Sequence, residues 1–302
     1  MTTAAPIAVP PLRAWLLAAR PKTLTAAVVP VVVGTGLALG QGVAALLPAL
    51  AALAGAVLIQ IGTNLTNDYY DFHKGADTAE RVGPVRVTQS GLIAPGTVLA
   101  AAAGCFALAV VVGMYLVFRG GWPFVVIGLL SVLAGWAYTG GPYPLGYHGL
   151  GDLFVLVFFG LVAVPGTFYA QAGHLVPAVW PAAVAIGALG TMILIVNNLR
   201  DADTDARAGK RTLVVRFGRP FGRAEYLTLL AVALAAPILL LTLGWARWPV
   251  LLPLLAVPLA LGPVRSVLNE TGPALNRTLA TTARLQAVYG LLLAAGLWLG
   301  GG

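Results

Sequence analysis

The chain alternates between long apolar runs and short polar connections. Nine runs come close to the roughly 20 mostly apolar residues that a helix needs to cross a bilayer. Glycine and proline recur inside these runs, which membrane helices tolerate because neighbouring helices re-satisfy the freed backbone groups. The pattern predicts an all-α membrane protein with nine transmembrane helices, at about residues 23–40, 45–67, 96–118, 122–139, 153–171, 178–199, 225–244, 248–267 and 281–299.

Nine spans leave no room for a separate soluble domain in 302 residues. We expect one transmembrane domain over residues 1–302, in which residues 1–12 form a flexible tail. The composition points the same way, because 59% of the residues are hydrophobic and only 9% are charged. A soluble domain carries about 25% charged residues, so lipid must cover much of this surface.

The basic residues predict the topology. The net charge of +8 would suit nucleic-acid binding, but 16 of the 18 basic residues lie in the N-terminal tail and in every second connection. Only Arg119 and Arg247 lie on the opposite side. The excess of Lys and Arg in cytoplasmic loops predicts a cytoplasmic N-terminus, an external C-terminus and no nucleic-acid partner. The expected location is a membrane that the chain crosses several times, with the N-terminus on the cytoplasmic side.

All ten acidic residues fall on that same side of the membrane, and seven of them lie in the two segments 68–80 and 201–205. Topology does not require this, since acidic residues contribute little to orientation. A site explains the clustering better than a solvated surface does. The alternative is that the clusters are helix ends solvated by Asp and Arg.

Helical spacing selects candidate ligands within each cluster. Residues three and four apart share a helix face, which groups Asn64 with Asp68 and Asp71, and Asn198 with Asp201 and Asp205. Asp203 is rotated by about 200° from Asp201, which makes it a weaker candidate. Mg²⁺ binds oxygen ligands and shares its shell with substrate phosphates. The six grouped residues are therefore the expected metal ligands, and a diphosphate is the expected substrate group.

Basic residues follow both clusters, and Lys74, Arg86 and Lys210 are the expected diphosphate contacts. The loop after the fourth run contains Tyr138, Tyr143 and Tyr147 but no Lys or Arg. This breaks the topology pattern and favours substrate positioning. A tyrosine ring face can stabilise a cation, although each tyrosine can equally be an aromatic anchor at the membrane interface.

Three stretches carry a family pattern: Asn67-Asp-Tyr-Tyr-Asp71, Tyr138-Thr-Gly-Gly-Pro-Tyr-Pro144, and Asn198-Leu-Arg-Asp-Ala-Asp-Thr-Asp205 followed by Gly209-Lys-Arg-Thr-Leu-Val-Val-Arg216. In this order they resemble the UbiA superfamily of intramembrane prenyltransferases, in particular its branch that prenylates 1,4-dihydroxy-2-naphthoate in menaquinone biosynthesis. Many members carry a further aspartate four residues after the second one. This chain has Gly75 there and an acid only at Asp77, which leaves the partner of Asp77 open.

The resemblance implies a helical bundle with a central cavity and cytoplasmic cap loops, in a bacterial cytoplasmic (inner) membrane. A polyprenyl diphosphate would ionise with the help of Mg²⁺ to an allylic carbocation, and an aromatic acid acceptor would attack it with loss of CO₂. Asp68, Asp71, Asp201, Asp205 and Tyr138 would be catalytic. The implied substrate contacts are Asn67, Lys74, Asp77, Arg86, Ser90, Tyr143, Tyr147, Arg200, Lys210 and Arg211.

Two alternatives remain at this point. The acceptor can be another aromatic compound, such as hydroxybenzoate, homogentisate or haem. A cation-coupled transporter also combines intramembrane carboxylates with internal repeats, but the odd-numbered runs contain no acidic residue to form a relay across the bilayer. The oligomeric state is open.

Overall fold

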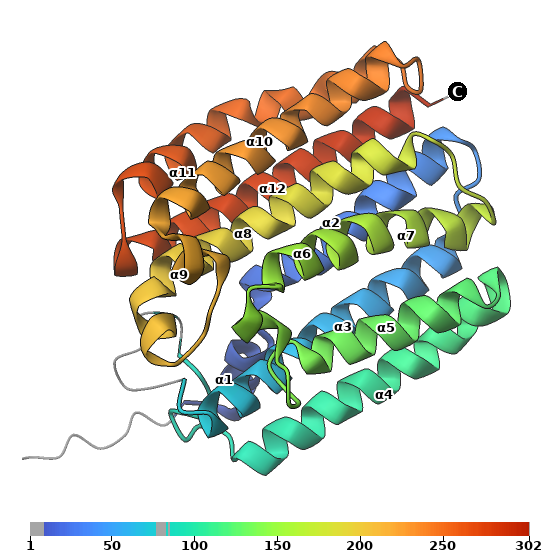
Figure 1. Cartoon of the computed structure of the whole chain (residues 1–302). Helices are drawn as coiled ribbons and strands as arrows, with labels where there is room; N and C mark the ends of the chain where they lie inside the picture. The colour runs from blue at the N-terminus through green and yellow to red at the C-terminus, as the bar shows by residue number, and fades with distance from the viewer. Residues whose placement is uncertain (1–8, 77–82, 84, 302) are drawn as a thin grey trace, which may run out of the picture.

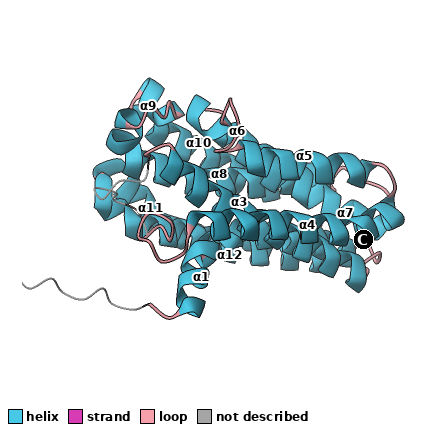
Figure 2. Cartoon of the chain, turned by 90° about the horizontal axis from the view of Figure 1, so that it is seen from below, coloured by secondary structure: helices cyan, strands magenta, loops and turns pink. Residues whose placement is uncertain are grey.

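The structure is a computed structural model that describes residues 9–76, 83 and 85–301. The described residues form helices and connections and contain no β-strand (Figure 2). Eight helical segments are long and apolar enough to cross a bilayer. They are α2 (Pro21–Gly40), α3 (Leu46–His73), α4 (Pro95–Gly120), Gly151–Ala172, α8 (Val179–Arg207), α10 (Arg219–Thr242), Trp248–Asn269 and Gly272–Leu299.

Three of these segments change helix type along their length. The first combines α6 (Gly151–Val155), η2 (Leu156–Val162) and α7 (Ala163–Ala172), and η2 is a π-helix. The second joins η3 (Trp248–Ala256) to α11 (Val257–Asn269), and the third joins η4 (Gly272–Ala274) to α12 (Leu275–Leu299). Proline at positions 249 and 253 accounts for the tighter helix of η3, because it removes backbone donors from the helical ladder.

The remaining predicted span is shorter than expected. α5 (Pro123–Ala137) has 15 residues and is about 22 Å long, which is less than the ~30 Å hydrocarbon core. Gly140, Gly141 and Pro142 follow it and cannot continue the helix. The described residues therefore contain eight helical segments of spanning length and one shorter apolar helix, instead of nine full spans.

Short helices lie at one end of the bundle. They are α1 (Pro11–Ala19), η1 (Leu145–His148) and α9 (Leu213–Phe217). The ends of α3 and α8 that carry the aspartates lie there too, and the C-terminus lies at the other end (Figure 1). Because α1 begins at Pro11, the tail predicted for residues 1–12 is partly helical, and residues 1–8 lie outside the described part.

α8 forms the centre of the core. It is buried along most of its length and packs against α2, η2, α10 and α12. Glycines bring the helices close together: a Cβ at Gly160 would lie 2.5 Å from the carbonyl oxygen of Ala183, and one at Gly187 would lie 2.6 Å from that of Leu156. Small residues let membrane helices approach closely in this way. The close contact fixes η2 and α6 against the helix that carries the second cluster.

Candidate active site

Two adjoining cavities lie between the aspartate-bearing helices. A polar cavity of about 400 Å³ lies at the end of the bundle and is lined by Asp71, Asp201 and Asp205. An apolar cavity of about 310 Å³ continues from it between α2, α3, α4, α5, α7 and α8. Six of the described residues line both cavities: Arg20, Thr23, Asn67, Tyr138, Leu194 and Asn197. The arrangement combines a charged chamber with an apolar one, and Tyr138 lies at their junction.

Asp71 is the centre of the polar contacts. It is buried, and its Oδ2 accepts a hydrogen bond of 3.1 Å from Nη2 of Arg86. Its Oδ1 accepts one of 2.8 Å from the hydroxyl of Tyr147, which is also buried. The first cluster is thereby joined to the loop 85–94 and to the tyrosine-rich loop 138–150.

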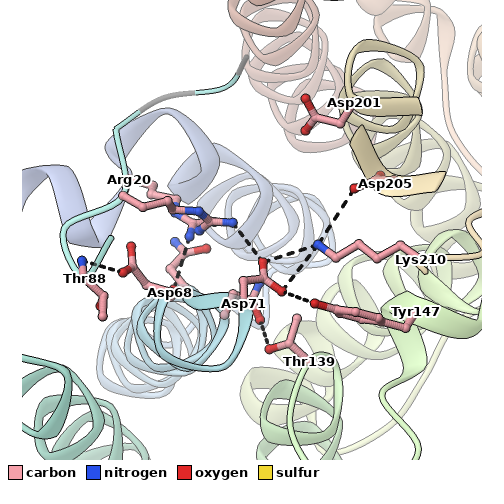
Figure 3. Close-up of polar contacts among 12 residues, drawn as sticks. Arg20, Asp68, Asp71, Thr88, Thr139, Tyr147, Asp201, Asp205 and Lys210 are labelled. Carbon is pink, nitrogen blue, oxygen red and sulfur yellow. Dashed lines mark hydrogen bonds and ion pairs between the residues drawn. The ribbon is translucent and has the colours of Figure 1, made fainter. Parts of the chain in front are cut away.

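Lys210 lies between the two clusters (Figure 3). Its Nζ is 3.4 Å from Asp71 Oδ1 and 4.0 Å from Asp205 Oδ1, and it lies 4.8 Å from the centre of the Tyr147 ring. The end of α3 and the end of α8 are therefore close enough for one ammonium group to contact both carboxylates. The two clusters are therefore close together in the fold, although Asp68 and Asp201 are 133 positions apart in the sequence.

The second cluster contains a bidentate ion pair. Arg200 donates from Nε to Asp201 Oδ1 at 2.8 Å and from Nη2 to Asp201 Oδ2 at 2.6 Å. Its Nη1 donates to Oδ1 of Asn276 at the start of α12, at 3.1 Å. Asp203 lies away from this cavity: it is 76% exposed and pairs with Arg219 at 2.8 Å. The helical rotation between Asp201 and Asp203 accounts for this difference.

Asp68 and Asn64 hold neighbouring segments. The Asp68 carboxylate accepts the backbone N–H of Thr88 at 2.9 Å and that of Val87 at 3.3 Å. Asn64 donates to the carbonyl oxygen of Ala19 at 3.0 Å, and its Oδ1 accepts from Gln60 at 3.2 Å. Asp68 does not line either cavity, whereas Asn64 lines the apolar one. Asp68 therefore orients the loop that supplies Arg86.

Lys74 and Asn67 contact the turn after α5. Lys74 Nζ donates to the carbonyl oxygen of Thr139 at 2.6 Å, and the Thr139 hydroxyl donates to Asn67 Oδ1 at 2.7 Å. Burial lowers the pKa of Lys74; the charge of Asp71 opposes this shift, and that of Lys210 adds to it. A partly buried ammonium group such as that of Lys74 favours the binding of an anion, because the anion compensates for the solvation that burial removes.

Among the other predicted residues that the structure describes, Tyr143, Ser90 and Arg211 line neither cavity, whereas Asn198 lines the polar one. Tyr143 is 57% exposed and stacks on His148, with ring centres 3.7 Å apart. Ser90 donates to the carbonyl oxygen of Arg86 at 2.6 Å, and Arg211 is exposed and uses its backbone N–H to bind the Tyr147 carbonyl oxygen at 2.8 Å. Asp77 lies outside the described residues.

Sequence reasoning missed Arg20 and Asn197, which line both cavities. Arg20 has φ of 52°, a positive value that no other non-glycine residue in the described part of the chain has. This geometry redirects the chain between α1 and α2, where Pro21 begins the helix. Arg20 is one of the 16 basic residues on the predicted cytoplasmic side, and topology alone is enough to explain it in the sequence. The sequence contains one signal for each residue. Arg20 directly precedes Pro21, and Asn197 lies beside Asn198 at the end of an apolar run.

The apolar cavity follows one face of α3 over four turns. Its α3 wall consists of Ala52, Gly55, Ala56, Ile59, Gln60, Thr63, Asn64 and Asn67, the spacing of a single helical face. The distance from Asn67 to Ala52 is about 22 Å at 1.5 Å per residue. The opposite wall includes Phe154 and Phe158, whose rings stack 5.7 Å apart. The cavity is thus long, narrow and suited to an extended apolar chain.

Comparisons with known proteins identify the family of this chain. The profile of the UbiA prenyltransferase family matches residues 27–299. The 1,4-dihydroxy-2-naphthoate octaprenyltransferase of Mycobacterium tuberculosis is 43% identical over 95% of this chain and 97% of its own length. The enzyme of the same name from Escherichia coli is 41% identical, with coverage of 95% and 96%.

Solved structures show the same fold. A UbiA homolog from Aeropyrum pernix K1 superposes with a TM-score of 0.70 at 16% identity, covering 88% of this chain and 95% of that chain. A UbiA homolog from Archaeoglobus fulgidus bound to DMAPP and Mg²⁺ superposes with a TM-score of 0.61 at 18% identity, with coverage of 92% and 98%. With its family profile matched over most of its length, the chain belongs to the UbiA prenyltransferase family.

Proposed function

We propose that this prenyltransferase transfers a polyprenyl group from polyprenyl diphosphate to 1,4-dihydroxy-2-naphthoate, in menaquinone biosynthesis. The observation that carries the proposal is the junction of a charged cavity with a long apolar one. The names of the bacterial relatives at 43% and 41% identity support the choice of acceptor.

The reaction balances without a further reactant. The bond between the allylic carbon and the diphosphate oxygen breaks, and the electron pair leaves with diphosphate. The ring carbon that bears the carboxylate bonds to the allylic cation. The carboxylate then departs as CO₂ and returns its bonding electrons to the ring. The product is the quinol form of demethylmenaquinone.

The residues of the polar cavity fit Mg²⁺. Among the described residues no group of three or more His, Cys, Asp or Glu is close enough to hold a metal. Mg²⁺ does not need such a cage, because it commonly binds through one or two carboxylates, substrate phosphates and water. Lys210 already places one positive charge within 4.0 Å of both Asp71 and Asp205. These two carboxylates, with Asp201 and Asn198, would hold the ion. When bound, Mg²⁺ would supply Lewis-acid stabilisation of the departing diphosphate.

The chain's own cations orient the diphosphate. Among the residues that the structure describes, six basic and three acidic side chains line the polar cavity, an excess of three positive charges. Arg86 and Lys210 contact Asp71 and can turn toward phosphate oxygens that enter beside it. Arg and Lys bind such oxygens as a fork and as a point charge respectively. These groups therefore hold the leaving group at the polar end of the apolar cavity.

Tyr138 acts at the junction of the cavities. Burial raises the pKa of its phenol well above the ordinary value, and the charges of Asp152, Asp71 and Asp205 raise it further. The phenol stays neutral, and its ring can face a developing allylic cation. The surrounding apolar side chains exclude water, which would otherwise capture that cation.

The membrane orientation is part of the proposal. In the described part of the chain, eight segments of spanning length and the shorter α5 form the bundle, and we propose that the loops at its polar end cap the site. The distribution of basic residues supports a cytoplasmic site, and the bacterial sources of the relatives support a bacterial inner membrane.

A panel of acceptors tests the proposed function. Purified protein would be given one prenyl diphosphate, Mg²⁺ and, in turn, dihydroxynaphthoate, hydroxybenzoate, homogentisate and haem. We expect release of diphosphate and CO₂ with dihydroxynaphthoate, and loss of both in Asp71→Ala. Turnover of a different acceptor, or undiminished release in Asp71→Ala, would contradict the proposal.

A further inference from the structure

Three glycines line the apolar cavity without being needed for helix packing. Gly55 of α3, Gly113 of α4 and Gly128 of α5 are wall residues, and an ideal Cβ at each has no neighbouring atom within 4 Å. Other glycines of these helices differ: a Cβ at Gly135 would lie 2.5 Å from Thr63, and one at Gly62 would lie 2.8 Å from Phe106. Side chains added at the first three positions would therefore extend into space that is now open.

The three glycines lie at a similar depth. Gly55 is nine residues from the start of α3, Gly113 is seven residues from the end of α4, and Gly128 is five residues from the start of α5. These helix ends lie away from the aspartate clusters (Figure 1). At 1.5 Å per residue, all three glycines are within about 14 Å of that end of the bundle. They come from three neighbouring helices and face one cavity.

The depth can be compared with the length of a prenyl chain. Gly55 is 12 residues from Asn67 on α3, which is about 18 Å. An extended chain advances about 1.2 Å per bond, as the extended polypeptide does over its three bonds per residue. An isoprene unit contributes four main-chain bonds, so about four units reach from the polar junction to the glycines.

We propose that Gly55, Gly113 and Gly128 form a gate that sets which prenyl donors the enzyme accepts. This inference rests on the proposed function, because it takes the apolar cavity as the site of the prenyl tail. The absent side chains let a tail longer than about four isoprene units continue past the glycines, whereas a shorter tail ends before them. Larger side chains at these positions would discriminate against long donors only.

The matched control is Gly104 on α4. It also has open space around its Cβ, but it does not line either cavity and it is exposed on the surface of the bundle. Replacing it by Leu makes the same change in helix propensity on the same helix as Gly113→Leu. A difference in donor preference between the two variants is therefore caused by the side chain in the cavity and not by a change in the stability of the helix.

The experiment measures kcat/KM for geranyl, geranylgeranyl and octaprenyl diphosphate with dihydroxynaphthoate. It uses the full-length wild type, Gly113→Leu, Gly128→Leu and Gly104→Leu. We expect the ratio of octaprenyl to geranyl turnover to fall about tenfold or more in the two cavity variants, the size of a typical overpacking cost. The ratio should be unchanged in Gly104→Leu. The same ratio should fall less in Gly113→Ala. This smaller variant keeps the proposal testable if a Leu variant folds poorly.

A binding measurement without acceptor tests the gate independently of the proposed prenyl transfer. Non-reacting thio analogues of the geranyl and octaprenyl donors would be titrated without acceptor, and the same ratio of affinities would be compared. A shifted affinity ratio without any turnover would support the gate and contradict the proposed acceptor chemistry. An unchanged ratio in every cavity variant would overturn the gate, because long tails would then not pass the glycines. An equal fall in Gly104→Leu would also overturn it, because the effect would then not depend on the cavity.

Discussion

At the scale of single residues, the site depends on how a few buried charges are compensated. Asp71 contacts Arg86, Tyr147 and Lys210, each from a different loop. Burying a carboxylate is costly unless it is paired and hydrogen-bonded. The three loops therefore assemble around one side chain, and the position of Asp71 organises the polar cavity.

Asp71→Asn should disable the enzyme and destabilise it. The substitution keeps the shape but removes the charge that compensates Arg86, and breaking a buried pair costs about 3–5 kcal/mol. We expect a clearly lower melting temperature and at least a ~100-fold lower kcat, since charge stabilisation in such sites is of this size. Asp203→Asn is the control, because Asp203 is exposed and pairs with Arg219 at the surface. Near-normal activity of Asp71→Asn would contradict the central role of this residue.

Lys210→Met should change two affinities in opposite directions. Removing the ammonium between Asp71 and Asp205 leaves two carboxylates without it, so Mn²⁺ alone should bind more tightly. Inorganic diphosphate should bind more weakly, because one phosphate contact is lost. Titration calorimetry would measure both, and each change should be about tenfold for a charge-assisted contact. Arg211→Met is the control, since Arg211 lies outside the cavity. A shift of both affinities in the same direction would rule out this position for Lys210.

At the scale of elements, the helices hold the loops that carry the chemistry. Asp68, near the end of α3, accepts two backbone N–H groups of the segment that contains Arg86. Its neighbour Asn64 connects α3 to the end of α1. In the first cluster, Asn64 and Asp68 hold neighbouring segments of the chain in place, whereas Asp71, one turn further along α3, lines the polar cavity.

Asp68→Ala should loosen the segment around Arg86. Hydrogen exchange of the Val87 and Thr88 amides should become at least about tenfold faster, because each loses an acceptor worth about 1.5–3 kcal/mol when charged. The affinity for inorganic diphosphate should fall with it. Asp68→Asn retains one acceptor oxygen and should give an intermediate exchange rate. Unchanged exchange in the alanine variant would show that the loop is held by other contacts.

Gly187→Ala should weaken the contact between α8 and η2. The added Cβ would lie 2.6 Å from the Leu156 carbonyl oxygen, and relieving such overpacking costs about 1–3 kcal/mol. A thermal unfolding curve in detergent would show a lower midpoint. Gly104→Ala, which meets no neighbour, should instead leave the midpoint unchanged or raise it. Equal midpoints for the two variants would contradict a close contact at Gly187.

At the scale of the whole molecule, the two aspartate clusters and the loops around them share one end of the bundle (Figure 1). The C-terminus and the residues around Arg247 lie at the other end, where the Arg247 N–H donates to the Gly300 carbonyl oxygen. The basic residues predict that the first end faces the cytoplasm.

Cysteine labelling tests this orientation. In a Cys105→Ser background, Asp203→Cys and Arg247→Cys would each place one exposed thiol at opposite ends. A membrane-impermeant maleimide added to intact cells should label only the second variant. Permeabilised cells provide the control, because both variants should then react. Labelling of Asp203→Cys in intact cells would reverse the proposed topology.

The apolar runs predicted the helices well but not their polar ends. The run 178–199 corresponds to α8, which continues to Arg207 and carries the second cluster as helix. Spacing identified the helix face of Asp71 and Asp205. It did not reveal that Asp68 binds backbone N–H groups of residues 87 and 88, or that Lys210 reaches Asp71. Those contacts depend on how loops fold over the helix ends, and periodicity within one helix contains no information about them.

Among the described residues that line the polar cavity, the excess of basic over acidic side chains has a kinetic consequence. A free divalent cation is repelled by the net positive charge of the cavity, so it should bind weakly before the prenyl diphosphate is present. A donor that arrives with its metal already bound carries less negative charge but still matches the chamber. Initial rates should therefore follow the concentration of the metal–donor complex and not that of free metal. The order of addition in this enzyme would then be set by the charges of the side chains that line the site.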